Sequence, residues 1–395
     1  MKKTLIAVAA AAALTATSAF AEITFGAWLR TLTAPVASNG EDTVVGTANS
    51  WGWGARTARI DINGVSEDGK AGFAMNVFND MSMDITAGDR AVLWVKPVDM
   101  IKISVGKYDS PDNGLRGDFC YGSWNWLRPY NWGFDGEGLT FDGIWRKGMM
   151  IEADPIEGLH AFVVIPMEDA NADSYYKKAE DTYRNVQIGF GYAIDGVGKL
   201  KAQFIGDDSY TTDAEGDRDE TKTTGQIGVA FDLNAVENLY VTVGARFGIA
   251  DKDYAPDYLK MAFTAGASYQ VSDAMKFSVD GGYKQYQDKT VGKDGDKKDN
   301  EFFVGAGVDY TIMDGLNLAA DVRYKNIGYG KEGDDGAISF LVGVNKSVSS
   351  NGSLGIGFQG ATNGCGFVQS GGKGLVADEA DDFVWAIPVS VSVWF

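Results

Sequence analysis

The strongest constraint in this sequence is a repeated alternation of apolar residues with polar or small ones, at a period of two residues. In residues 239–247 one face carries Leu, Val, Val, Ala and Phe, while the other carries Tyr, Thr, Gly and Arg. Residues 259–267 and 316–324 alternate in the same way. Successive side chains of a β-strand point to opposite faces, so the pattern predicts strands with one apolar face. Each segment is about ten residues long, the length that a tilted strand needs to cross a bilayer.

Very short connections join these segments in pairs, and several contain an acid, a glycine and an apolar residue, as in Glu157-Gly158-Leu159. Longer acidic connections lie between the pairs. Short periplasmic turns alternating with longer extracellular loops are typical of transmembrane barrels. We therefore expect about eight tight hairpin turns, at residues 66–69, 98–100, 155–159, 195–198, 234–238, 272–274, 313–316 and 349–352.

About eight turns and two termini at the same end predict an all-β, antiparallel up-and-down transmembrane barrel of about 18 strands. The least certain part of this count is residues 139–165. If residues 139–145 and 149–153 form one strand, the up-and-down order stays consistent, and we expect this arrangement. A barrel of about 16 strands is the alternative.

The N-terminus has the pattern of a secretory signal peptide. Lys2 and Lys3 precede an apolar stretch at 5–14, and Ala19 and Ala21 precede Glu22 in a small-residue cleavage pattern. The apolar stretch is too short to be a membrane anchor. We therefore expect residues 1–21 to be a cleaved signal peptide and residues 22–395 to be a single barrel domain.

Charge and residue types exclude several functions. The formal charge of −19 becomes −21 when Lys2 and Lys3 leave with the signal peptide, which argues against nucleic acid as a partner. The only histidine, His160, follows a predicted periplasmic turn, far from the extracellular rim where a hydrolase site would lie. The acidic runs do not have the spacing of a calcium loop. We expect neither enzymatic activity nor a cofactor or metal.

The end of the chain indicates which membrane the barrel occupies. Residues 387–395 alternate strictly and finish at Phe395. This resembles the C-terminal signature of bacterial outer-membrane proteins, whose final aromatic residue is recognised by the barrel-assembly machinery. The resemblance implies export to the outer membrane, contact with its lipid, and a role for Phe395 as an assembly signal.

The longest irregular segment follows the expected fifth strand, at residues 101–106. It begins Lys-Tyr-Asp-Ser-Pro at 107–111 and continues to about residue 137. General porins of Gram-negative bacteria have a similar strand end, followed by a loop that folds into the pore. The resemblance implies a homotrimeric channel for passive diffusion of small hydrophilic solutes and ions. It also implies that the acids of this loop include pore-constriction residues, namely Asp109, Asp112, Asp118, Asp135 and Glu137.

A barrel of this size is too wide for its own side chains to fill, so a water-filled lumen follows. Basic residues of the early strands are candidates for the pore wall. Parity places Arg30, Arg59, Lys70 and Lys102 on the small, polar face, whereas both faces around Arg90 and Lys96 are apolar. Facing the loop acids, these bases would create a transverse field across the pore. Alternatively, they pair with nearby acids and only solvate the lumen.

The ion preference of such a pore depends on two opposing sets of charges. Acidic loops favour cations at the mouth of the pore, whereas basic inner faces favour anions. We expect a weak preference for cations.

Other features of the long loop leave alternatives open. Its aromatic side chains could form a path for sugar rings, or could pack the loop against the wall. A sugar-selective porin is therefore an alternative, and a surface structural protein or adhesin is another. Two cysteines lie in expected extracellular loops, where a disulfide is permitted but not required. The residues concerned are Tyr121, Trp124, Trp126, Tyr130 and Trp132 for the aromatic path, and Cys120 and Cys365 for the disulfide.

Overall fold

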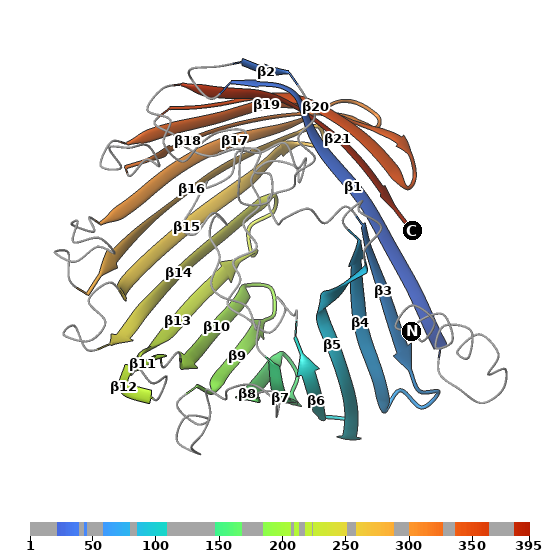
Figure 1. The fold of residues 1–395 in the computed structure, drawn as a ribbon, viewed down its shortest axis with the longest axis vertical. Helices are drawn as coiled ribbons and strands as arrows, with labels where there is room; N and C mark the ends of the chain where they lie inside the picture. Colours follow the sequence, from blue (N-terminus) through green and yellow to red (C-terminus); the bar gives the residue numbers. More distant parts are fainter. Residues whose placement is uncertain are drawn as a thin grey trace.

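The chain folds into a closed antiparallel β-barrel of 18 strands (Figure 1). The computed structural model describes residues 22–38, 43–45, 58–79, 85–108, 147–167, 185–206, 209–212, 218–222, 224–250, 258–287, 300–326, 336–362 and 383–395. None of these residues forms a helix that is long and apolar enough to span a membrane.

The barrel strands follow one another around the wall in chain order. They are β1 (Glu22–Ser38), β3 (Ala58–Val65), β4 (Ala71–Asn79), β5 (Ile85–Val98), β6 (Ile101–Lys107), β7 (Lys147–Ile156), β8 (Leu159–Pro166), β9 (Gln187–Ile194), β10 (Gly198–Gly206), β13 (Thr224–Leu233), β14 (Leu239–Ala250), β15 (Leu259–Ser272), β16 (Met275–Tyr286), β17 (Glu301–Met313), β18 (Leu316–Lys325), β19 (Ala337–Ser349), β20 (Gly352–Ala361) and β21 (Val384–Trp394).

Three short strands lie outside this series. β2 (Thr43–Val45) pairs with the end of β1, and β11 (Ser209–Thr212) pairs with β12 (Arg218–Lys222) in a separate hairpin between β10 and β13. The barrel closes where β1 pairs with β21 on one side and β3 on the other. At the seam, the Phe395 N–H donates to the Ala27 carbonyl at 2.7 Å, and the Ala27 N–H donates back at 3.0 Å.

The predicted topology is confirmed. All eight expected turns connect neighbouring barrel strands, and the expected fifth strand is β6, the fifth strand of the barrel. The alternative of about 16 strands is wrong. β7 leads directly into the turn at 157–158, so one strand precedes that turn, as expected. Residues 139–146 lie outside the described part of the chain. The acid-glycine motif has a conformational reason, because Gly158 and Gly315 adopt φ of 81° and 68°, which side-chain-bearing residues rarely do.

The two faces of the wall differ as the alternation predicts. Large apolar side chains cover the outer face, and many are strongly exposed, among them Leu93 at 68% and Val304 at 53%. The inner face carries polar and charged side chains separated by glycines. Because side chains opposite one another on neighbouring strands share a face, the pairing register decides which charges meet inside the barrel.

Gly305 of β17 provides a direct test of this packing. It lies on the inner face between Asp280 of β16 and Arg323 of β18. A Cβ added there would lie 2.4 Å from Asp280 Oδ1 and 2.9 Å from Arg323 Cζ. Gly305→Ala should therefore displace this buried ion pair and lower the free energy of unfolding by about 1–3 kcal/mol, measured by urea unfolding in lipid vesicles.

The matched control is Gly26→Ala on the inner face of β1, where the nearest atoms to an added Cβ are 3.8 and 3.9 Å away. This variant should unfold close to the wild-type urea concentration. Equal stability of the Gly305 variant and the wild type would contradict the described packing.

Candidate functional site

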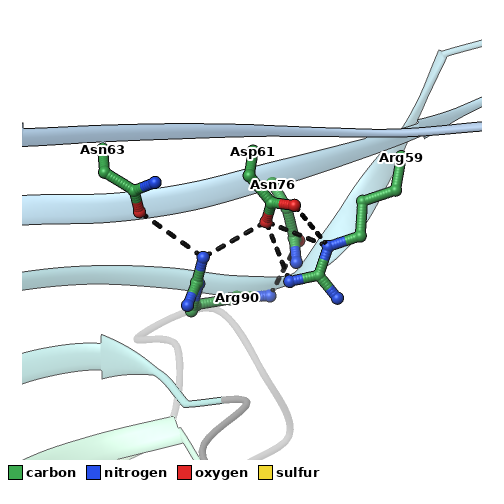
Figure 2. Close-up of polar contacts among 5 residues, drawn as sticks. All are labelled: Arg59, Asp61, Asn63, Asn76 and Arg90. Carbon is green, nitrogen blue, oxygen red and sulfur yellow. Dashed lines mark hydrogen bonds and ion pairs between the residues drawn. The ribbon is translucent and has the colours of Figure 1, made fainter. Parts of the chain in front are cut away.

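The inner wall is the candidate site, and one partly exposed cluster of polar and charged side chains on it comes from β3, β4 and β5 (Figure 2). Arg59 and Asp61 are two residues apart on β3 and therefore point to the same face. Arg59 Nη2 lies 2.8 Å from Asp61 Oδ1, and Arg59 Nε donates to both carboxylate oxygens, at 2.9 and 3.0 Å. Arg90 reaches the same oxygen from β5, with its Nη2 3.2 Å away.

A local irregularity in the β4–β5 pairing places Arg90 there. The register shifts between Met75 and Val77, and the side chain of Asn76 occupies the shifted region. Its Oδ1 accepts a hydrogen bond from the Arg90 N–H at 3.0 Å. Gly88 leaves the necessary space, since a Cβ at this position would lie 1.8 Å from Asn76 Oδ1. The Arg90 guanidinium also lies 3.5 Å from Asn63 Oδ1.

The charges of this cluster are partly exposed. Two guanidinium groups share one carboxylate, so the three groups together carry a formal charge of +1. The side chains of Arg59, Asp61 and Arg90 are 20%, 20% and 27% exposed. Partial exposure leaves the field of these charges only partly screened by water.

Lys96 of β5 and Lys102 of β6 lie between Trp94 and the short turn that joins these strands. Both ammonium groups are 5.9 Å from the centroid of the Trp94 ring, within the range of cation–π attraction. Lys102 Nζ is also 2.8 Å from Glu152 Oε2. For Lys102, pairing with a nearby acid is therefore what the structure shows.

The remaining basic candidates have different positions. Lys70 is exposed in the turn before β4, where its carbonyl accepts the Lys96 N–H at 2.7 Å, so it lies at the rim of the barrel. In the same turn, the Ser66 hydroxyl donates to Asp68 Oδ1 at 2.6 Å and lowers the pKa of that carboxyl group. Arg30 pairs through its backbone with Ser392 of β21, and its side chain is outside the description.

The other site residues expected from the sequence lie outside the described residues. These are the loop acids Asp109, Asp112, Asp118, Asp135 and Glu137, the aromatics Tyr121, Trp124, Trp126, Tyr130 and Trp132, and the cysteines Cys120 and Cys365.

A second charged cluster, on β16–β18, was not predicted. Arg323 forms a bidentate pair with Asp280, with both nitrogen–oxygen distances at 2.9 Å, and its Nε lies 3.3 Å from Asp321 Oδ1. All three side chains are at most 3% exposed. Alternation in the sequence places Asp321 and Arg323 on one face. It gives no sign that Asp280, 43 residues earlier, is their partner, because this contact depends on the pairing of β16, β17 and β18.

Comparisons with known proteins agree with this geometry. A family model described as Gram-negative porin matches residues 7–330. A search of curated proteins found no match.

Solved structures match over nearly the whole chain. An anion-selective porin from Comamonas acidovorans has 15% sequence identity and a TM-score of 0.53, with 95% of this chain and 100% of that chain covered. OmpT, an outer membrane protein of Vibrio cholerae in its trimer form, has 12% identity and a TM-score of 0.44 over the same shares. A mutant of the Rh. blastica porin has 15% identity and a TM-score of 0.49, again over 95% and 100%.

A closed 18-strand barrel with an apolar outer face and a charged inner wall defines an outer-membrane channel protein. The chain belongs to the Gram-negative porin family. It is accordingly a channel for the diffusion of small hydrophilic solutes across the outer membrane.

The cluster on β3–β5 leads to a test by charge substitution. Arg90→Gln removes one positive charge, and the anion-over-cation permeability ratio should fall about twofold at low salt. Asp61→Asn should raise the ratio by a similar factor. The measurement is the reversal potential of single channels under a salt gradient. Arg90→Lys keeps the charge and serves as the control. Equal reversal potentials in all four proteins would show that this cluster does not face the ion path.

Proposed function

We propose that this porin is a general, passive diffusion channel whose weak ion preference results from two opposing charge distributions. The observation that carries the proposal is the polar, charged inner face of a closed barrel too wide for its own side chains to fill. A small hydrophilic solute can remain hydrated along such a wall, so size and charge decide its passage.

The direction of the ion preference follows from where the charges lie. Acidic residues are concentrated between the strands, and the chain without residues 1–21 carries −21. These acids raise the local cation concentration at the mouths of the pore. The arginine pair at Asp61 acts against them on the wall. We therefore propose a weak overall preference for cations, which the wall cluster reduces but does not reverse.

Four finer proposals accompany this function. The acids between Asp109 and Glu137 line the constriction, as in the porins that this segment resembles. Phe395 is the signal for the assembly machinery, in keeping with its backbone pairing at the seam. The protein is a homotrimer and has no catalytic role. Its only histidine, His160, lies beside a turn and faces the carboxylates of Glu152 and Asp154.

The experiment is single-channel recording from purified protein in planar bilayers. We expect ohmic conductance steps, with three equal sublevels for each inserted particle if the channel is a trimer. A liposome-swelling assay with neutral sugars should give rates that fall with solute size and do not distinguish stereoisomers of equal size.

Three results would contradict the proposal. The absence of conductance in several lipids would exclude the channel, and single unitary steps without sublevels would exclude the homotrimer. Clear discrimination between sugars of equal size would favour the sugar-selective alternative over general diffusion.

A further inference from the structure

His160 lies on the inner face of β8, two residues after the turn that joins β7 to β8. Its backbone is opposite Gly191 of β9. Its ring is 30% exposed and lies among charged side chains of the wall. Nδ1 is 2.8 Å from Asp154 Oδ1, and Nε2 is 3.9 Å from Glu152 Oε1. The Nε2 atom itself is buried and, within the described part of the chain, has no hydrogen-bond partner.

The groups around the ring come from every neighbouring strand. β7 contributes Glu152 and Asp154, and β6 contributes Lys102, whose ammonium is bound to Glu152 at 2.8 Å. β9 presents Gly191, which has no side chain. A Cβ on this glycine would lie 3.0 Å from Lys199 Cε, so the stem of Lys199 from β10 lies across it.

These charges balance while the imidazole is neutral. Lys201 of β10 is opposite Gly191 in register, across from His160, and its Nζ lies 2.7 Å from Asp232 Oδ2. With this ion pair included, the formal charges of the three lysines and three carboxylates sum to zero, so a proton on His160 adds one positive charge to this part of the wall. The neutral ring can donate from Nδ1 to Asp154, and the proton would then be taken up at Nε2, on the side that faces Glu152. The new charge therefore arises on a partly exposed wall of the lumen.

We propose that His160 is a selectivity-determining residue whose protonation shifts the channel toward anions as the pH falls. Histidine changes its charge between about pH 5 and 8, where ordinary carboxylates are already ionised and lysines are still protonated. The sequence contains one histidine. The proposal therefore concerns a single residue, and it rests on the proposed channel function.

The test compares the reversal potential of wild type, His160→Gln and His160→Lys in a dilute KCl gradient at about pH 7 and about pH 5.5. One added charge on the wall should raise the wild-type anion-over-cation permeability ratio about twofold at the lower pH. His160→Gln should keep the ratio found at pH 7 under both conditions. His160→Lys should show the ratio found at pH 5.5 under both conditions.

The possible outcomes distinguish the role of His160 from the channel function itself. A pH dependence that persists in His160→Gln, or that is absent from a conducting wild type, overturns the role of His160 and leaves the channel intact. Failure of all three proteins to conduct, although heat-modifiable mobility on gels shows that they are folded, overturns the channel function as well. A twofold change that is lost in both variants supports the proposal.

Discussion

The structure depends on one constraint: a chain crossing lipid must satisfy every backbone N–H and C=O group internally. A sheet achieves this only when its first strand pairs with its last. In this chain the pairing of β1 with β21 removes both edges, and the reciprocal hydrogen bonds between Ala27 and Phe395 complete it at one end. Closure also creates an interior, and everything the protein does takes place there.

The interior acquires its character from pairs of charges held across neighbouring strands. Glycines make these contacts possible, because Gly88 leaves room for Asn76 and Gly305 leaves room for Arg323 and Asp280. The clusters differ in exposure. The arginine pair at Asp61 is partly exposed, and we propose that it acts on passing ions, whereas the Arg323 cluster is almost fully buried and links β16 to β18.

Features that depend on neighbouring residues in the sequence could be predicted, and features that depend on register could not. The period of two and the acid-glycine turns are local signals, and they were sufficient for the strand count and the position of the fifth strand. The position of Arg90 could not be predicted in this way, because an irregularity in the β4–β5 pairing brings it to Asp61. The segment after Tyr108 has no regular period. Its proposed constriction residues therefore rest on resemblance alone.

The central claim is that the inner face of the wall is in contact with water while the outer face is in contact with lipid. Adjacent residues on β15 test this most directly, since Thr264 belongs to the inner face and Ala265 to the outer face. In a background with Cys120 and Cys365 replaced by serine, each position is changed to cysteine and treated in membranes with a membrane-impermeant maleimide. We expect rapid labelling of Thr264→Cys and protection of Ala265→Cys. Equal labelling of both, or the reverse order, would contradict the central claim.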